Sequence, residues 1–257
     1  MTYCLGMLLD AGLVMMADTR TNAGVDNISS YRKLHVLADE PDRQVFAATA
    51  GNLSVTQTAI SMIREGLPSG QGEGEGQGQG RPRTLADASS MFRAAQLVGE
   101  ALKIANRSVG EALESLNIAG GSTLLVGGRI GRGRPSLFLI YEAGNFIECQ
   151  REVPFFQIGE TKYGRPILDR VVRASTPLAE AVKIGFLSFD SSMRSNLAVA
   201  RPLDLMVMPS DPDLPVLTRR IENNDPYFND LSSRWSELLH EATRAIPDPP
   251  FMLPALK

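Results

Sequence analysis

The apolar residues fall into two strand-like blocks, and each block is followed by segments with helical spacing. The first block predicts two β-hairpins, formed by residues 2–20 and 31–51, with turns at 10–12 and 39–42. Both strands of the first hairpin are almost continuously apolar, which is typical of strands buried on both faces. A helix capped by Asn52 is predicted to follow the second hairpin.

Residues 68–84 read PSGQGEGEGQGQGRPRT and are the clearest low-complexity segment. Such a composition cannot bury enough apolar surface to offset its ordering entropy. A domain linker and a flexible loop are both compatible with this segment. The helical spacing on either side, at 53–67 and 85–106, favours a Gly-rich loop between two helices of one domain.

The second block predicts four strands, two helices, one further strand and a C-terminal helix. The strands lie in 122–130, 135–144, 145–150 and 155–159, the helices in 162–174 and 178–187, and the last strand and helix in 197–208 and 228–246. Strand blocks followed by helix pairs favour an α+β fold, with two stacked sheets and helices outside them. We therefore expect one domain over residues 1–257, with a C-terminal helical extension at about 216–257.

Composition and charge exclude several classes of function. The 257 residues carry 26 Lys and Arg against 29 Asp and Glu, a net charge of −3, which argues against a nucleic-acid partner. No segment approaches the roughly 18–20 apolar residues that span a bilayer. The N-terminus lacks a basic region, and only two cysteines occur, Cys4 and Cys149. These features predict a cytoplasmic protein without a membrane partner.

The first candidate for chemistry is Thr2. Threonine behind an initiator methionine allows Met1 to be removed, so that Thr2 becomes the first residue of the working chain. A hydroxyl needs a base before it attacks a carbonyl carbon. A free α-amine has an ordinary pKa of about 7.7–8.0 and can take that proton. An N-terminal threonine therefore combines nucleophile and base, although Met-Thr starts are common.

Hairpin geometry places three further residues near Thr2. If the sequence numbers of paired residues in the first hairpin add up to 21 or 22, Thr2 faces Thr19 or Arg20. Asp18 then lies beside Thr2. In the second hairpin, with a sum of about 81, Lys33 and Gly51 lie at the same edge of the sheet. The four residues cluster if the hairpins are neighbours.

The chemistry of these types assigns each a role. Lys33 would lower the pKa of the threonine hydroxyl and be held by Asp18 as an ion pair. The amide of Gly51, at the start of a helix, would donate to an oxyanion. Spacing alone leaves a plainer interpretation open, in which Asp18 and Lys33 form a solvated pair and Gly51 is only a strand-to-helix turn.

Several stretches together resemble a known family. TYCLGMLLDAGLVMMADTRTNAG, YRKLH, AATAGNLSVTQ, STLLVGG, FFQIGETKYGRPILDR and SFDSSMRSNLAVARPLDL are similar to proteasome-type β subunits. They resemble most closely the bacterial Anbu (ancestral β-subunit-like) branch, which is related to the HslV peptidases. The resemblance runs from Thr2 to about Val207 and leaves 68–84 outside.

The resemblance implies an N-terminal nucleophile (Ntn) hydrolase with a four-layer αββα sandwich. It implies a threonine peptidase with Thr2 as nucleophile, Asp18 and Lys33 as its ion pair, and Gly51 as oxyanion donor. It requires no metal or cofactor. It further implies a peptide or unfolded-protein substrate and a homo-oligomer, either a ring or an open helical ring, and leaves an ATPase partner open.

Supporting positions fit the family pattern less closely. The stretch that orders the amino terminus matches Gly159, Glu160 and Thr161, and a carboxylate at Glu160 would raise the pKa of the α-amine. An Asp and a Ser that contact the terminus in relatives are three residues apart. Here Asp190 and Ser195 are five apart, so the correspondence is loose.

Three alternatives remain. Cys4 is a weak candidate nucleophile, with His35 or His240 as base, because its apolar strand would keep the thiol protonated. A catalytically silent scaffold subunit would keep the fold without the chemistry, although it would need none of Thr2, Asp18 and Lys33. An Ntn amidase acting on a small or tagged peptide would share both fold and chemistry.

Overall fold

The computed structural model describes residues 2–22, 28–68, 81–115 and 120–251. The chain divides into two compact units, residues 1–222 and 223–257. The first unit holds both sheets and the helices packed on them. The second holds α5 (Pro226–Ala245), whose first turn is capped by the Asp225 carboxylate accepting a hydrogen bond from the amide of Phe228 at 2.9 Å.

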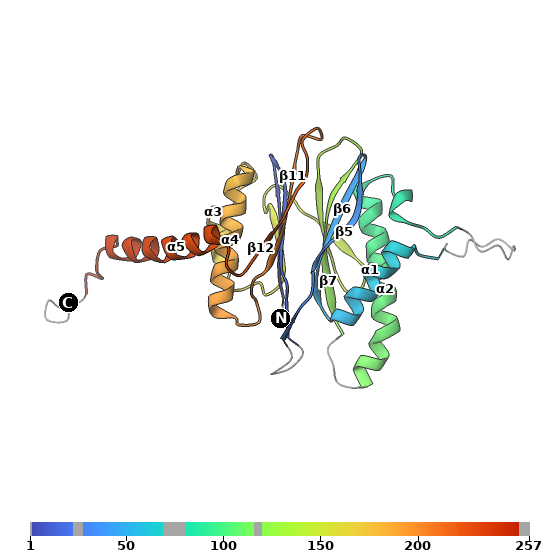
Figure 1. Ribbon diagram of the computed structural model, residues 1–257, viewed down its shortest axis with the longest axis horizontal. Helices are drawn as coiled ribbons and strands as arrows, with labels where there is room; N and C mark the ends of the chain where they lie inside the picture. Colours follow the sequence, from blue (N-terminus) through green and yellow to red (C-terminus); the bar gives the residue numbers. More distant parts are fainter. Residues whose placement is uncertain (1, 23–27, 69–80, 116–119, 252–257) are drawn as a thin grey trace. The chain divides into compact units, whose positions relative to one another are not determined.

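Two antiparallel five-stranded sheets form the centre of the first unit (Figure 1). The first sheet has the order β10-β1-β2-β11-β12, with β1 (Tyr3–Leu9), β2 (Gly12–Asp18), β10 (Phe155–Gly159), β11 (Leu203–Pro209) and β12 (Leu217–Ile221). The second has the order β5-β6-β7-β8-β9, with β5 (Leu34–Glu40), β6 (Arg43–Gly51), β7 (Ser122–Ile130), β8 (Ser136–Ile140) and β9 (Phe146–Glu148). Short strands β3 (Arg20–Asn22) and β4 (Ile28–Ser30) pair separately.

Helices cover the outer face of each sheet. The pair α1 (Leu53–Glu65) and α2 (Met91–Ser115) shares a core with β6, β7 and β8, while α4 (Leu178–Ser195) packs on β1 and β2 and α3 (Arg165–Val171) lies beside α4. A second core, which contains Cys4, Met15, Phe46 and Leu125, fills the space between the sheets. Figure 1 shows these four layers edge-on, which confirms the predicted αββα sandwich.

The first hairpin pairs as predicted, and the second differs slightly. Cys4 lies opposite Ala17, so opposing residues sum to 21. In the second hairpin Leu34 lies opposite Ala48, one residue beyond the expected register, and a bulge between Val36 and Ala38 shifts it by one more. The bulge inserts one unpaired residue into β5. Lys33 lies just before β5, and its carbonyl accepts a hydrogen bond from the amide of Thr49 at 2.9 Å.

Several helix boundaries differ from the predictions, and α3 is shorter at both ends than the predicted 162–174. Helix α2 begins at Met91, because a 3₁₀ turn, η1 (Leu85–Asp87), is closed by Thr84 and Asp87 and followed by extended backbone at Ala88. Helices α2 and α4 continue beyond the predicted ends, to Ser115 and Ser195. The predicted ends follow the regular apolar spacing, whereas the last turns of α4 bury Phe189 together with polar side chains such as Ser188 and Ser192.

Residues 217–221 were expected within a helical extension and instead form the edge strand β12. Their sequence, LTRRI, lacks a clear alternation, because only Ile221 is buried and the arginines lie on an exposed edge. The Gly-rich loop predicted over 68–84 lies largely outside the described residues. Its two ends are joined by reciprocal backbone hydrogen bonds of 2.8 Å between Leu67 and Arg83, so the segment leaves and re-enters the same unit.

Candidate active site

Thr2 lies immediately before β1, against the end of β10. Its carbonyl accepts a hydrogen bond from the amide of Glu160 at 2.6 Å. Gly159 adopts a φ of +82°, and a Cβ there would lie 2.0 Å from the Thr2 carbonyl oxygen. Only glycine fits this close approach. The predicted neighbours Gly159 and Glu160 are therefore beside Thr2 in the structure.

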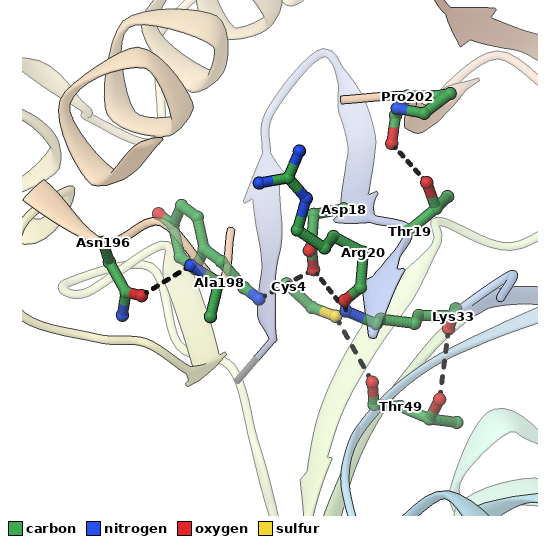
Figure 2. Close-up of polar contacts among 10 residues, drawn as sticks. Cys4, Asp18, Thr19, Arg20, Lys33, Thr49, Asn196, Ala198 and Pro202 are labelled. Carbon is green, nitrogen blue, oxygen red and sulfur yellow. Dashed lines mark hydrogen bonds and ion pairs between the residues drawn. The ribbon is translucent and has the colours of Figure 1, made fainter. Parts of the chain in front are cut away.

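Asp18 and Lys33 form a buried ion pair at the end of β2. The Lys33 ammonium donates to Asp18 Oδ1 at 2.8 Å and to the Arg20 carbonyl at 2.5 Å (Figure 2). The same Asp18 oxygen accepts the amide of Tyr3, the residue after Thr2, at 2.9 Å. Asp18 is fully buried and Lys33 is 4% exposed. The pair is thus not solvated, and one oxygen atom ties the lysine to the backbone next to Thr2.

Burial and the lysine act on Asp18 in opposite directions. Burial raises the pKa of the Asp18 carboxyl, while Lys33 and the hydrogen bond from the Tyr3 amide lower it. The raising effect is the larger, so the carboxylate depends on its partners to stay ionised. Removing Lys33 would take away the largest of these compensating effects and leave the Asp18 carboxyl buried without a counter-charge.

Gly51 ends β6 and is immediately followed by the cap of α1. Its φ is +114°, and a Cβ there would lie 2.3 Å from the carbonyl oxygen of Gly121. Asn52 caps α1 by accepting the amides of Ser54 and Val55. The main chain at Gly51 therefore stands at the positive end of a 13-residue helix, in a conformation that requires glycine.

A cavity of about 610 Å³, here named the Gly51 cavity, lies where β6 and β10 end and β7 begins. Its lining includes Gly51 from β6 and Gly159 from β10, which contacts Thr2. The other lining residues come from the end of β6, the start of β7 and the β8–β9 turn; they are Ala50, Gly121, Ser122, Thr123, Tyr141, Glu142, Ala143 and Asn145. The cavity is thus lined by the predicted oxyanion donor, Gly51, and by a glycine that contacts the backbone of the predicted nucleophile, Thr2.

The Glu160 carboxylate is held by two donors. Oε1 accepts the amide of Lys162 at 2.9 Å, and Oε2 accepts Nδ2 of Asn196 at 2.8 Å. Asn196 caps the C-terminal end of α4, and its own side-chain oxygen accepts the amide of Ala198 at 3.0 Å (Figure 2). Sequence reasoning missed Asn196, although it lies one residue beyond Ser195.

Asp190 and Ser195 lie in the last two turns of α4. Asp190 pairs with Arg194 one turn later, at 3.0 Å, and Ser195 is exposed. In the described ranges no hydrogen bond joins either residue to Thr2. Asn196, which follows Ser195, is the residue from this segment that reaches the Thr2 surroundings, through Glu160.

Cys4 lies in the core and not in the cavity. Its side chain is fully buried between the sheets, and Sγ lies 3.5 Å from the Thr49 carbonyl (Figure 2). Burial raises the pKa of the Cys4 thiol far above its ordinary value, so the reactive thiolate is disfavoured. Burial, together with Arg64 and Arg32, lowers the pKa of His35 to about 4. A Cys4–His35 pair therefore has neither the access nor the ionisation that catalysis needs.

Among the described residues, no group of three or more His, Cys, Asp and Glu side chains is arranged to hold a metal ion. In the same part of the chain, no helix is both long enough and apolar enough to cross a membrane.

Solved structures provide the decisive comparison. Anbu (ancestral β-subunit) from Yersinia bercovieri is 37% identical and matches 98% of this chain and 100% of its own with a TM-score of 0.84. The Gly−1 mutant of Anbu from Hyphomicrobium sp. strain MC1 is 42% identical over 97% of this chain and 99% of its own, with a TM-score of 0.84. This chain belongs to the Anbu family.

A third Anbu structure matches equally well. The helical assembly of the Anbu complex from Pseudomonas aeruginosa has a TM-score of 0.85 and 37% identity over 97% of this chain and 99% of its own. No family model matches the chain, and no curated protein does. The family membership confirms the resemblance and, with the αββα layers, the proteasome-like Ntn fold.

Proposed function

We propose that this Anbu chain is a threonine peptidase that hydrolyses peptide bonds once Met1 has been removed. The observation that carries the proposal is the shared Asp18 oxygen, which binds both Lys33 and the Tyr3 amide. This contact ties the Lys33 ammonium to the backbone amide of Tyr3, which directly follows the residue that would become the amino terminus. A buried ion pair is costly to form and does not by itself favour stability, so its placement at this site suggests a functional role.

The proposed reaction uses Thr2 and two neighbouring groups. The α-amine takes the proton from Thr2 Oγ as this oxygen attacks the substrate carbonyl carbon. The Gly51 amide stabilises the oxyanion, assisted by the positive end of α1. The amine then gives the proton to the leaving nitrogen as the carbon–nitrogen bond breaks. Water hydrolyses the resulting ester and regenerates Thr2.

The contacts at the end of β10 position the nucleophile. The Glu160 amide fixes the Thr2 carbonyl, and Gly159 lets β10 approach closely enough for that bond. Lys162 and Asn196 hold the Glu160 carboxylate in turn. We infer that Glu160 acts through position and charge, and that Asp190 and Ser195 support α4 and do not contact the substrate.

We further propose a cytoplasmic homo-oligomer. A relative from P. aeruginosa forms a helical assembly of the Anbu complex, and this chain aligns with nearly its whole length. The two cysteines are free and buried, which agrees with a reducing compartment. Enclosure of the threonines in a ring or open helical ring would restrict cleavage to peptides or unfolded chains.

Peptide hydrolysis by the wild type, Thr2→Ser and Thr2→Ala tests the proposal. The wild type should cleave, Thr2→Ser should retain part of the activity through its hydroxyl, and Thr2→Ala should lose it. Equal cleavage by all three would exclude an N-terminal nucleophile. Activity confined to short or tagged substrates would favour the amidase, and complete inactivity of a chain that lacks Met1 would favour the silent scaffold subunit.

A further inference from the structure

The β8–β9 turn brings one ionisable acid to the Gly51 cavity. Among the described residues that line this cavity, Glu142 is the only Asp, Glu, Lys or Arg. The other polar lining side chains are neutral hydroxyl and amide groups: Ser122, Thr123, Tyr141 and Asn145. The formal charge of the lining is therefore set by Glu142.

The Glu142 carboxylate lies one glycine away from Gly51. A Cβ on Gly121 would be 2.4 Å from Glu142 Oε2, so the carboxylate rests against the bare Gly121 backbone. The Gly121 carbonyl oxygen in turn would be 2.3 Å from a Cβ on Gly51. Gly121 thus lies between Glu142 and Gly51 in space, which brings the carboxylate close to the predicted oxyanion donor.

The turn that carries Glu142 is fixed at three points. The Tyr141 amide donates to the Asn145 carbonyl at 2.9 Å, and the Gly144 amide donates to the Tyr141 carbonyl at 2.8 Å. The side chain of Asn106, on α2, donates to the Glu142 carbonyl at 2.7 Å. The backbone beneath the carboxylate is thus held by hydrogen bonds and presents the side chain from a defined position.

The carboxylate itself has no partner within the described ranges. Glu142 makes no ion pair and no side-chain hydrogen bond there, although it is exposed to the cavity mouth. Two basic residues, Lys103 and Arg107, line an adjoining cavity of about 850 Å³ that shares Gly121 and Glu142 with the Gly51 cavity. Because Glu142 is exposed and lines the Gly51 cavity, a cation in that cavity can reach the carboxylate.

We propose that Glu142 is a specificity-determining residue that selects peptides with a lysine or arginine next to the bond presented to Thr2. The assignment rests on the proposed function for the path by which a peptide reaches Thr2. A cationic side chain in the Gly51 cavity would meet the one acidic group of its lining. An acidic side chain would meet a like charge there.

Binding to the inactive chain tests this assignment without requiring catalysis. Ten-residue Ala/Gly peptides with a single lysine, norleucine or glutamate at each central position would be titrated against Thr2→Ala by fluorescence anisotropy. Norleucine matches most of the lysine stem without its charge. At the best position, lysine should bind about threefold to tenfold more tightly than norleucine at low salt, as expected for a partly exposed ion pair.

Second substitutions in the Thr2→Ala background identify the group responsible. Glu142→Gln should remove the preference, and Glu142→Lys should reverse it in favour of glutamate. Glu148→Gln is the matched control, because Glu148 is an exposed acid on β9 outside the Gly51 cavity, and it should leave the preference unchanged. Retention of the lysine preference in Glu142→Gln, or its absence from Thr2→Ala itself, would overturn the assignment.

The same peptides distinguish this assignment from the proposed function. If wild type fails to cleave a lysine peptide that Thr2→Ala binds preferentially, the peptidase proposal fails while the Glu142 preference stands. If the wild type and a Glu142→Gln variant with Thr2 intact cleave all peptides at equal rates, the peptidase proposal stands and the Glu142 assignment is wrong.

Discussion

The Lys33 ammonium lies 2.8 Å from Asp18 Oδ1, and both side chains are buried at the strand end next to Thr2. Burial raises the pKa of the Asp18 carboxyl, and the positive charge of Lys33 opposes this effect and favours the ionised carboxylate. The pair therefore couples the stability of the fold to the chemistry proposed for Thr2, and these two roles can be separated by mutation.

Lys33→Met should destabilise the chain by about 3–5 kcal/mol and abolish peptide cleavage, because it leaves Asp18 buried without a counter-charge. The double variant Asp18→Asn/Lys33→Met removes both charges and should recover part of that stability without recovering cleavage. Urea unfolding and peptide hydrolysis, measured on the same samples, check both expectations. Activity that returned together with stability would show that the pair is only structural.

Gly51→Ala should lower cleavage at least tenfold and destabilise the fold by about 1–3 kcal/mol. The added Cβ meets the Gly121 carbonyl and opposes a positive φ, which displaces the amide proposed to bind the oxyanion. Gly131→Ala is the matched control, since Gly131 also has a positive φ, +71°, but open space around it. It should show the backbone strain alone, with unchanged cleavage per folded chain; an equal loss in both variants would argue against a specific role for Gly51.

Glu160→Gln should move the acidic limb of the pH–rate profile to lower pH by a few tenths of a unit to about one unit. A carboxylate near an α-amine favours the ammonium form, so removing its charge makes the neutral base available at lower pH. The variant keeps the backbone bond to Thr2, and its single side-chain oxygen can still accept from Asn196, while the bond from the Lys162 amide is lost. Profiles of kcat/KM between pH 5 and 9 measure the shift, and an acidic limb that stays in place would remove Glu160 from the electrostatics of the base.

His35 should make the fold sensitive to acid. Its pKa is about 4 in the folded chain and near 6.5 when exposed, so the unfolded chain binds more protons between these values and stability falls as the pH falls. Between pH 7.5 and 4.5 the wild type should lose on the order of 2 kcal/mol more than His35→Gln. Urea unfolding at a fixed protein concentration checks this difference, and parallel losses would contradict it.

Sequence pattern predicted the elements better than the contacts between them. The tight turn at Asp10 fixed the register of the first hairpin, and Asp18 lies where that register puts it, beside Tyr3. Gly51 was also predictable, because a glycine between a strand and the capping residue Asn52 indicates a strand-to-helix junction.

The remaining residues are brought together only by the tertiary fold. Asn196 reaches Glu160 across 36 positions of sequence, because α4 extends about two turns beyond its predicted end. Glu142 reaches the Gly51 cavity because β7 and β8 bring the β8–β9 turn beside Gly121. Neither residue belongs to a periodic pattern, and such contacts between distant segments leave no signal in a single sequence.

The Cys4→Ala variant should retain cleavage. It is therefore a control for the identity of the nucleophile. The thiol is buried between the sheets, so its removal leaves Thr2 untouched and costs only the packing of one small side chain. Cleavage rates and inhibition by thiol-alkylating reagents check this expectation. Loss of cleavage in a Cys4→Ala chain with normal thermal stability would transfer the nucleophile to Cys4.

Intact-mass spectrometry after treatment with an electrophilic peptide probe tests the central claim most directly. The wild-type chain should appear without Met1 and with one added probe, located on Thr2 by fragmentation, while Thr2→Ala should remain unlabelled. A wild-type chain that retains Met1, or equal labelling of Thr2→Ala, would contradict the claim that Thr2 supplies both the nucleophile and its base.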